Sequence, residues 1–421
     1  MTSEEIHEYA LGLAKKARSA SARIRTVRAD VRNQVLLEVA KSLRENEKLI
    51  LKENAKDLAA FKDKISPAKY DRLTLNHERL EGIAAGVEQI ATFADPLGKV
   101  LEQRKLDNGV DISRVSVPLG CVFFIYESRP NVTIDGAALC FKAGNAVILR
   151  GGKESLYSSK ILANIFRDAL QKFGVDPDAV QLVEYADHSI VGMLLKMHDY
   201  LDLVIPRGGE NLIRAVTNQS SIPVIKHFNG ICHIYVDKSA NIDMAAKIVE
   251  NAKTQRCGTC NTMETLLLDS ALSDADVKKI LDPLRAKNVE FFGDKETQTR
   301  LSDVKDFEEE DGYHHEYLAF KLSIRFVKNV EEACDHIEKN SSRHTESVIA
   351  EDKAVQEYFL AHVDSSSVMV NASTRLADGG VYGLGAEVGI STDKIHARGP
   401  MGVESLCTYK WVLIGEGQIR S

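Results

Sequence analysis

Apolar and charged residues follow one another with a helical period through the first 95 or so residues of the chain. Ile6 and Leu13 fall on one face of a predicted helix, and Val35 and Val39 fall on one face of another. The stretch 80–93 shows the same spacing. Apolar side chains three or four positions apart are typical of amphipathic helices. We therefore predict several successive helices, with few strands, in this region.

The pattern changes between Gly98 and Val117, where two segments of alternating character flank the turn Asp107-Asn108-Gly109. Asn-Gly is a strong hairpin signal because both residues tolerate a positive φ. We predict a β-hairpin here. It is either a plain surface hairpin or an arm that projects to a neighbouring subunit.

From residue 119 onward, short segments rich in Val, Ile and Leu alternate with helical segments. The first series of predicted strands covers 121–127, 146–150, 180–185, 201–206 and 222–227. A second series begins near Cys232 and covers 232–237, 263–269, 289–292, 322–327 and 347–350. Apolar strands separated by helices imply parallel sheets covered on both faces. The predicted fold class is α/β, and such sheets bind ligands at the carboxyl ends of their strands.

Length and composition bound the kind of protein this is. The 421 residues suggest two or three domains, and 44% hydrophobic with 27% charged residues is an ordinary globular composition. A net charge of −7 argues against a general nucleic-acid surface. We find no secretion signal and no apolar run long enough for a membrane span. The seven scattered cysteines favour a reducing cytoplasm over a disulfide framework.

The sharpest local feature is the segment 255–262, which reads QRCGTCNT and lies between a predicted helix and a predicted buried strand. A cysteine in such a loop can act as a nucleophile where a cation or a helix N-terminus favours its thiolate. Cys257 and Cys260 also have the spacing of redox and zinc motifs, but no thioredoxin-like context and no second ligand pair accompany them. On the local sequence alone, a catalytic cysteine and two buried thiols are comparable interpretations.

Three further polar segments directly follow predicted strands. Residues 127–133 open a helix, and their amides and the Asn131 side chain suit an oxyanion, although Asn131 is equally suited to cap that helix. Residues 150–155 and 207–209 combine arginine with glycines, which suits a phosphate-bearing cofactor. Neither segment is a G-x-G-x-x-G or Walker motif, and each alone is compatible with a polar turn. Two such loops in one parallel sheet favour a dinucleotide crevice.

The C-terminal part contains a cluster of glycines at 378–387. Such a cluster indicates a backbone that bends tightly or approaches a ligand closely, or else a long surface loop. Arg398 follows nearby and could bind an anion. His314 and His315 have no partner motif, so we expect two exposed histidines and no metal site.

Taken in order, these segments resemble the aldehyde dehydrogenase superfamily over nearly the whole chain. PLGCVFFIYESRPNVT is similar to the segment with the family's oxyanion asparagine, and LCFKAGNAVILRGGKES is similar to its cofactor strand and loop. The resemblance implies that Cys260 is the catalytic nucleophile, with Cys257 the less suitable of the pair. It implies Asn131 as the oxyanion donor. HHEYLAFKLSIRFV is similar to the segment whose glutamate contacts the nicotinamide ribose, here Glu316.

The resemblance also implies a Rossmann-like cofactor domain, an α/β catalytic domain and a small oligomerisation arm, and therefore a homo-oligomer. We expect the cofactor domain at 1–98 and 118–227 and the catalytic domain at 228–404. The arm is expected to combine the hairpin 99–117 with a terminal strand at 405–421. The expected cofactor contacts are Arg150, Gly151, Gly152, Lys153, Glu154, Arg207, Gly208, Gly209 and Glu316.

Several long segments, among them NAKTQRCGTCNTMETLLL and ADGGVYGLGAEVGIST, are similar to the branch of this superfamily that reduces glutamyl 5-phosphate in proline biosynthesis. This implies NADPH as the cofactor and a cysteine thioester as the intermediate. A separate glutamate kinase would supply the labile acyl phosphate, since the chain has no room for one. Hydrolytic relatives carry a general-base glutamate upstream of the cysteine, where this chain has 226–230 with His227 near its place. The missing base favours phosphate over water as the second acyl partner.

Three charged residues beside the matched motifs are candidate contacts for the substrate. Asp378 could pair with its ammonium group, and Arg129 or Arg398 with an anionic group. The competing hypotheses are a dehydrogenase with a coenzyme A acyl donor, a hydrolytic aldehyde dehydrogenase, and a non-catalytic protein that keeps the fold. Dependence on acyl phosphate, phosphate-independent oxidation and cofactor binding without activity would separate them.

Overall fold

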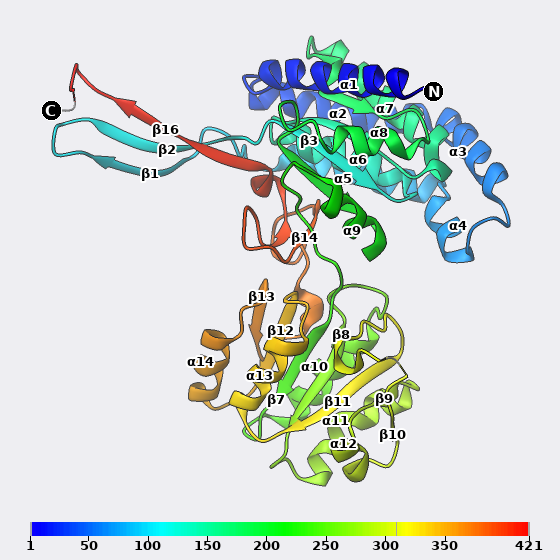
Figure 1. Cartoon of the computed structure of the whole chain (residues 1–421), viewed down its shortest axis with the longest axis vertical. Helices are drawn as coiled ribbons and strands as arrows, with labels where there is room; N and C mark the ends of the chain where they lie inside the picture. The colour runs from blue at the N-terminus through cyan, green and yellow to red at the C-terminus, as the bar shows by residue number, and fades with distance from the viewer. Residues whose placement is uncertain (1, 309, 420–421) are drawn as a thin grey trace. The chain divides into compact units, whose positions relative to one another are not determined.

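The computed structural model describes residues 2–308 and 310–419, which form two compact units (Figure 1). The first unit extends to Lys226 and also contains 384–389 and everything from Met401 onward. The second unit comprises 227–383 and 390–400. Residues 384–389 and 401–404, which we expected in the catalytic domain, therefore belong to the first unit. Their contacts explain this, since Gly385 lies against the Phe93 ring and Glu387 lies near Arg207.

Five helices open the first unit, as predicted, and their apolar faces are buried. They are α1 (Ser3–Ile24), α2 (Ala29–Glu45), α3 (Glu47–Phe61), α4 (Pro67–Leu73) and α5 (His77–Thr92). A capping box starts α1, in which the Thr2 hydroxyl accepts from the Glu5 amide at 3.2 Å and the Glu5 carboxylate accepts from the Thr2 amide at 2.7 Å. This reciprocal pairing satisfies two amides that have no partner within the helix.

A four-stranded parallel sheet lies at the centre of the first unit. Its order is β5 (Val180–Leu182), β4 (Ala146–Arg150), β3 (Cys121–Tyr126) and β6 (Leu203–Arg207). The connecting helices are α6 (Pro130–Lys142), α7 (Leu156–Lys172) and α8 (His188–Leu194), with α9 (Glu210–Gln219) after β6. Short 3-10 turns occur at η1 (Lys153–Ser155) and η2 (Pro177–Ala179). Every residue of β3 and β4 is buried, as expected for a sheet covered on both faces.

The predicted strand at 222–227 is wrong. This segment makes only one isolated parallel bridge, between Val224 and Val204. The Val204 amide donates to the Pro223 carbonyl oxygen at 2.9 Å, and the Ile225 amide donates to the Val204 carbonyl oxygen at 3.0 Å. Pro223 has no amide hydrogen, so the ladder cannot continue on the side of the bridge that precedes Val224.

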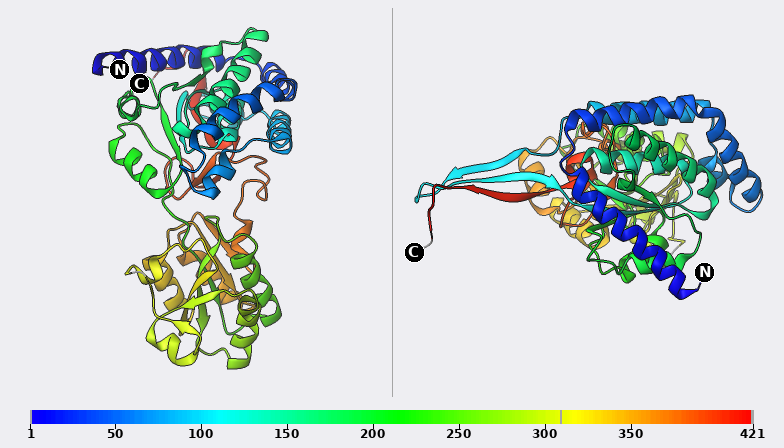
Figure 2. Two further views of the ribbon diagram at one scale, coloured as in Figure 1. Left: turned by 90° about the vertical axis from the view of Figure 1, so that its right-hand side faces the viewer. Right: turned by 90° about the horizontal axis from the view of Figure 1, so that it is seen from above.

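A three-stranded antiparallel arm also belongs to the first unit (Figure 2). It consists of β1 (Val100–Lys105), β2 (Asp111–Pro118) and β16 (Cys407–Ile414), with β2 in the middle. The hairpin between β1 and β2 is confirmed, and Gly109 in its turn has a φ of +87°. The terminal strand is shorter than predicted. It follows η5 (Val403–Leu406), and a small separate sheet pairs β14 (Gly389–Ser391) with β15 (Gly399–Met401).

The second unit is built on a seven-stranded parallel sheet. The strand order is β10 (Val304–Lys305), β9 (Glu290–Phe292), β11 (Lys321–Val327), β8 (Met263–Asp269), β7 (Cys232–Val236), β12 (Thr345–Ile349) and β13 (Ser367–Val370). Its helices are α10 (Ile242–Thr254), α11 (Asp274–Ala286), α12 (Lys295–Arg300), α13 (Val330–Asn340) and α14 (Lys353–His362), with 3-10 turns η3 (Gly312–His314) and η4 (Thr374–Leu376). One apolar cluster contains α10 and α11, and another contains α13 and α14. Both faces of the sheet are therefore covered.

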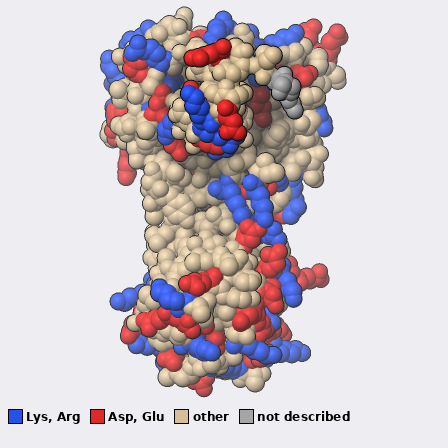
Figure 3. Space-filling model, turned by 90° about the vertical axis from the view of Figure 1, so that its left-hand side faces the viewer, with Lys and Arg blue, Asp and Glu red and all other residues tan. Residues whose placement is uncertain are grey.

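Acidic and basic side chains intermingle over the face drawn in Figure 3. Among the described residues, no helix combines the length and the apolar character needed to cross a membrane.

Candidate active site

Cys260 lies on a tightly bonded loop between α10 and β8 of the second unit. The Thr262 hydroxyl donates to the Arg256 carbonyl oxygen at 2.9 Å, and the Thr262 amide donates to the Thr259 carbonyl oxygen at 3.0 Å. The Asn261 side chain donates to the Ala377 carbonyl oxygen at 3.0 Å. Cys260 itself is partly exposed. The loop thus holds a reachable thiol on a fixed backbone, which is what a nucleophile requires.

A second backbone segment presses directly against Cys260. A Cβ atom added to Gly230 would lie 1.8 Å from the Cys260 carbonyl oxygen, so only glycine fits there. The Gly230 amide donates to the Glu316 carboxylate at 2.7 Å. The buried Cys232 thiol donates to the Cys260 carbonyl oxygen at 3.2 Å. Glu316, predicted to bind the cofactor ribose, is therefore adjacent to the backbone that supports the predicted nucleophile.

A fully buried ion pair ties this region together. The Lys253 ammonium on α10 donates to the Glu264 carboxylate on β8 at 2.6 Å, and the Leu318 amide donates to the same carboxylate at 3.2 Å. Burial raises the pKa of Glu264 to about 7 and lowers the pKa of Lys253. The pair connects the helix before the loop, the strand after it and the segment that carries Glu316.

Arg375, which no sequence motif indicated, braces the same loop. Its guanidinium donates to the Thr259 hydroxyl at 2.8 Å and to the Gln255 side chain at 2.9 Å. Burial and the neighbouring Arg256 charge lower the pKa of Arg375. Among the residues that the structure describes, none bonds to the Arg256 guanidinium. Arg256 and Arg375 thus both lie at the loop of Cys260. The sequence alone did not indicate the role of Arg375, because this residue is far from the loop along the chain.

His227 makes contacts of a structural kind. Its Nδ1 lies 2.9 Å from the Ile390 carbonyl oxygen, and its ring lies edge-on to the fully buried His344 ring, with 5.8 Å between centroids. Burial lowers the pKa of His344 to about 3, so that ring stays neutral at physiological pH. These contacts fit the expectation that His227 is not a substitute for the missing base.

Asn131 lies in the first turn of α6 in the first unit. The N-cap of this helix is Arg129, and Pro130 occupies the first helical position, so the interpretation of Asn131 as the helix cap is wrong. The Asn131 side chain donates to the Asp135 carboxylate one turn later at 2.9 Å. Burial raises the pKa of Asp135 to about 6. One hydrogen of the Asn131 amide is thus engaged, and Asp135 fixes the orientation of that amide.

Loops at the carboxyl ends of β3, β4 and β6 converge on one cavity of the first unit. A Cβ on Gly152 would lie 2.1 Å from the Ser128 hydroxyl, and the Gly209 amide donates to the Glu127 carboxylate at 2.8 Å. The cavity has a volume of about 210 Å³. Its lining residues are Ile65, Lys69, Arg72, Tyr126, Glu127, Ser128, Arg129, Arg150, Gly152, Glu154 and Leu212. A polar, partly basic cavity at this edge of a parallel sheet fits a nucleotide cofactor.

The predicted cofactor residues differ in how they lie relative to this cavity. Arg150, Gly152 and Glu154 line the cavity. Gly151, Lys153, Gly208 and Gly209 lie in the loops around it without lining it, and Arg207 instead approaches Glu387, at 3.7 Å. Glu316 belongs to the second unit. Of the segments that line this cavity, the loops after β3 and β4 were predicted from the sequence, whereas Lys69 and Arg72 of α4 were missed.

The three candidate substrate residues differ in how far they are already engaged. Arg129 lines the cavity of the first unit. Asp378 is exposed, and its carboxylate accepts from the Gly380 amide at 2.9 Å. Arg398 donates to the Asp364 carboxylate at 2.6 Å and to its carbonyl oxygen at 2.7 Å. Arg398 thus has an internal anionic partner, and it is the least available of the three.

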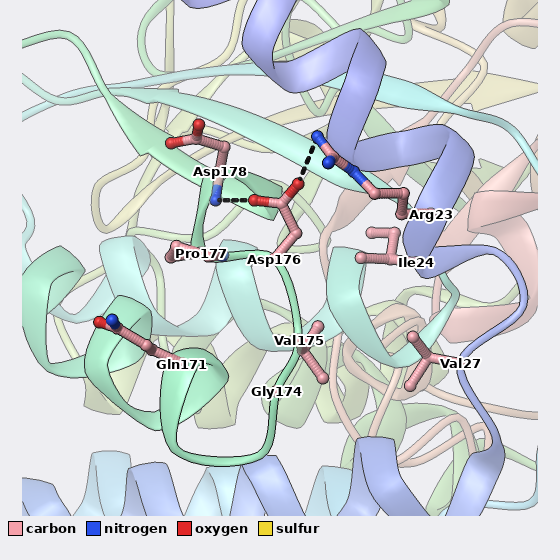
Figure 4. A pocket seen from close by; sticks show the side chains of 9 residues that line it. All are labelled: Arg23, Ile24, Val27, Gln171, Gly174, Val175, Asp176, Pro177 and Asp178. Atoms are coloured by element: carbon pink, nitrogen blue, oxygen red, sulfur yellow. Dashed lines mark hydrogen bonds and ion pairs between the residues drawn. The ribbon is translucent and has the colours of Figure 1, made fainter.

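A second hollow, of about 630 Å³, lies beside the end of α1 (Figure 4). In its lining, the Arg23 guanidinium forms an ion pair with the Asp176 carboxylate at 2.8 Å, and the Asp178 amide donates to the same carboxylate at 2.9 Å. These residues precede β5, so the hollow is at the amino end of that strand. Ligands of parallel sheets bind at the opposite edge, which makes this hollow a weaker candidate.

Cysteine and histidine side chains are the usual groups for redox and metal chemistry. All seven cysteines are free thiols. Within the described ranges, no group of three or more His, Cys, Asp or Glu side chains is arranged to hold a metal ion. His314 and His315 contact the Asn340 carbonyl oxygen and the Asp311 carboxylate, respectively.

Comparison with known proteins agrees with this architecture. Residues 3–307 match the family model described as the aldehyde dehydrogenase family. The chain belongs to the aldehyde dehydrogenase family, which confirms the predicted fold class.

Among its similar relatives within this family are gamma-glutamyl phosphate reductases. That of Desulfatibacillum aliphaticivorans is 47% identical over 99% of this chain and 100% of its own length. That of Nautilia profundicola is 46% identical over 96% of this chain and 98% of its own. The crystal structure of gamma-glutamyl phosphate reductase from Thermotoga maritima is 39% identical, covers 98% of this chain and 100% of its own, and superposes with a TM-score of 0.96. The predicted resemblance to this branch is confirmed.

Proposed function

We propose that this chain reduces L-glutamyl 5-phosphate to L-glutamate 5-semialdehyde and phosphate, with NADPH, as the second step of proline biosynthesis from glutamate. The observation that carries the proposal is a partly exposed cysteine on a braced loop, in a chain 47% identical to a gamma-glutamyl phosphate reductase. Cys260 is the proposed nucleophile and Asn131 the proposed oxyanion donor.

In the first half of the reaction, the Cys260 thiolate attacks the acyl carbon of the substrate. A carbon–sulfur bond forms, the carbon–oxygen bond to phosphate breaks, and phosphate leaves with the electron pair. The Asn131 amide and the Cys260 backbone amide donate to the oxyanion of the tetrahedral intermediate. Arg256 and Arg375, which flank the loop, suit the departing phosphate because guanidinium groups pair well with phosphate oxygens.

The second half reduces the thioester. NADPH, when bound, supplies the hydride for this step. Asn131 again stabilises the oxyanion, and collapse of the resulting thiohemiacetal expels the Cys260 thiolate and releases the aldehyde. The absence of a glutamate at 226–230 supports this route, because a thioester without a neighbouring general base is protected from water. Forming the thioester first replaces one difficult reduction by two easier steps.

The proposed cofactor site is the basic cavity of the first unit, with Arg150, Gly152 and Glu154 in its lining and Gly151 and Lys153 in the same loop. Residues 207–209 support the neighbouring loop. Glu316 is the proposed partner of the nicotinamide ribose. A solved relative of this fold, an engineered glycolyl-CoA reductase, has NADP⁺ bound.

The remaining assignments belong to the same proposal. A separate glutamate kinase supplies the substrate, and the arm joins copies of the chain into a homo-oligomer. Arg129 and Asp378 are proposed contacts of the glutamyl phosphate, and Arg398 a weaker one. The seven free thiols suit a reducing cytoplasm.

The reverse reaction tests the proposal. NADP⁺ reduction with glutamate 5-semialdehyde is measured with and without inorganic phosphate, for the wild type, Cys260→Ala and the matched control Cys257→Ala. We expect activity that requires phosphate, disappears in Cys260→Ala and persists in Cys257→Ala. Activity without phosphate would indicate a hydrolytic dehydrogenase, and activity in Cys260→Ala would remove the proposed nucleophile.

A further inference from the structure

The cavity of the first unit holds more cations than its carboxylates can balance. Its lining contains Lys69, Arg72, Arg129 and Arg150, against Glu127 and Glu154. Both carboxylates accept hydrogen bonds from neutral groups, Glu127 from the Gly209 amide and Glu154 from the Ser128 hydroxyl. Of the cations, Lys69, Arg72 and Arg150 form no ion pair with any residue in the described parts of the chain. The cavity is therefore built for an anion.

Two of these cations come from outside the sheet. Lys69 and Arg72 are three residues apart on α4, so both side chains lie on one side of that short helix. Arg129 and Arg150 instead end the loop and strand at the sheet's carboxyl edge. The sheet's own loops form the usual nucleotide crevice of such folds. α4 thus brings additional positive charge to a crevice that already has its own.

A buried network fixes α4 against the cofactor loop. The Asn54 side chain, on α3, donates to the Leu73 carbonyl oxygen at 2.9 Å and accepts from the Leu75 amide at 2.9 Å. It also donates to the Ser158 hydroxyl at 3.0 Å. Nearby, the Asp57 carboxylate accepts from the Ser158 amide at 2.8 Å and from its hydroxyl at 2.6 Å. The end of α4 and the start of α7, which follows the loop 151–155, therefore share one set of buried partners.

We infer that Lys69 and Arg72 bind the 2′-phosphate of the adenosine half of NADPH and so set the preference for NADPH over NADH. This inference rests on the proposed function for its cofactor. A carboxylate such as Glu154 suits the free ribose hydroxyls of NADH and repels a 2′-phosphate. Positive side chains offset that repulsion, and arginine binds phosphate oxygens with paired hydrogen bonds. The two cations of α4 supply this charge beside Glu154 in the same cavity.

Binding of adenosine fragments tests the inference without any turnover. Adenosine 2′,5′-bisphosphate and 5′-AMP differ only in the 2′-phosphate, and calorimetry measures the dissociation constant of each. We expect the wild type to bind the bisphosphate more tightly. Lys69→Met and Arg72→Met should each weaken bisphosphate binding about tenfold and leave 5′-AMP binding within about twofold. Lys62→Met is the matched control, since Lys62 lies just before α4 and outside the cavity lining, and it should change neither.

The inference fails if the wild type binds both fragments with equal affinity. It also fails if Lys69→Met and Arg72→Met bind the bisphosphate as tightly as the wild type does, or if these variants lose affinity equally for the bisphosphate and for 5′-AMP. Arg72→Lys and Lys69→Arg keep the positive charge and should retain most of the bisphosphate affinity. The melting temperatures of all these variants should match that of the wild type. Kinetics separates this inference from the proposed function. If phosphate-dependent, Cys260-dependent oxidation persists while NADP⁺ and NAD⁺ serve equally well, only the role of α4 has failed.

Discussion

Gly230 is the residue at which the packing around Cys260 is tightest. A side chain there would meet the Cys260 carbonyl oxygen at 1.8 Å and its Cα atom at 2.5 Å. Both are backbone atoms, which cannot rotate away as the end of a side chain can. Because Gly230 also donates to Glu316, any shift would disturb the nucleophile and a proposed cofactor ligand together.

We therefore predict that Gly230→Ala lowers kcat about 100-fold, because a displacement near 1 Å at a reacting group costs roughly that much. Gly258→Ala is the control on the same loop, since an added Cβ there meets nothing within 4 Å. Steady-state kinetics and the rate of Cys260 alkylation by iodoacetamide measure the effect. A Gly230→Ala enzyme as active and as reactive as Gly258→Ala would contradict this account of the packing.

Asn131 provides a second prediction at the scale of single residues. Asn131→Ala should lower turnover by about 10²–10³-fold, as loss of an oxyanion donor does, with little change in cofactor affinity. Steady-state kinetics and cofactor titration check both parts. A loss of only a few-fold would remove Asn131 from the oxyanion site.

The orientation of that amide depends on Asp135, whose pKa burial raises to about 6. Ionised Asp135 is the stronger acceptor, so the Asn131 contact is complete above pH 6 and weakens as the pH falls through this value. We expect kcat to decline below about pH 6 for this reason, and Asp135→Asn to lose that inflection. An identical pH profile in the variant would show that Asp135 does not position Asn131.

The candidate residues that could be predicted from the sequence belong to continuous motifs. Cys260, Asn131 and the loop 150–155 all lie in segments that follow or precede a recognisable strand. Arg375 and the role of Gly230 were not predictable, because their contacts join parts of the chain that are far apart in sequence. Lys69 and Arg72 were missed for the same reason, since α4 is distant from the loops whose cavity it lines.

At the scale of helices and strands, the buried ion pair of Lys253 and Glu264 connects α10 to β8. Removing one partner leaves the other charge buried without compensation, which is costly. We predict that Lys253→Met lowers the free energy of unfolding by about 3 kcal/mol, measured by denaturant titration. Replacing both partners with uncharged residues of similar size should recover part of that loss.

The exposed pair of Lys305 and Glu290 is the matched control for this prediction. Lys305→Met should change the free energy of unfolding by less than about 1 kcal/mol, because water screens the pair. Equal losses in Lys253→Met and Lys305→Met would contradict a structural role for the buried pair.

Strands with a strong apolar pattern were predicted well, and some short strands without one were missed. β4 and β8 match their predicted ranges, because each is a fully buried strand with at least three apolar residues in succession. β10 has two residues and β13 four, among polar neighbours, which is too little pattern to detect. The false strand at 222–227 has an apolar pattern, but Pro223 limits its pairing.

At the scale of the whole molecule, β16 forms one edge of the arm among the described residues, and it carries exposed apolar side chains. Leu413 and Ile414 on β16 are 59% and 68% exposed. An exposed apolar edge strand invites pairing with another chain. We predict that the chain is a homo-oligomer and that the double variant Leu413→Glu with Ile414→Glu is a monomer, measured by analytical ultracentrifugation. The control variant Lys410→Glu, at another exposed position of β16, should keep the mass of the wild type. An unchanged mass in the double variant would exclude the arm as the oligomerisation element.

The resemblance implied a boundary between the two domains after residue 227, and the main boundary between the two compact units lies after Lys226. The return of 384–389 and 401–404 to the first unit was not predicted, because it depends on contacts with Phe93 and Arg207 rather than on any local signal. The fold class could thus be predicted from periodicity and resemblance. Which residues belong to each unit depends on packing between segments that are far apart in the sequence, and this could not be predicted.

The central claim is that Cys260 carries the acyl group. The most direct test is rapid-quench mass spectrometry of the wild type mixed with glutamate 5-semialdehyde and NADP⁺ in the absence of phosphate. We predict that the peptide containing Cys260 gains the mass of a glutamyl group, and that adding phosphate removes it. An unmodified Cys260 peptide in the absence of phosphate, or a glutamyl group on Cys257 instead, would contradict the account.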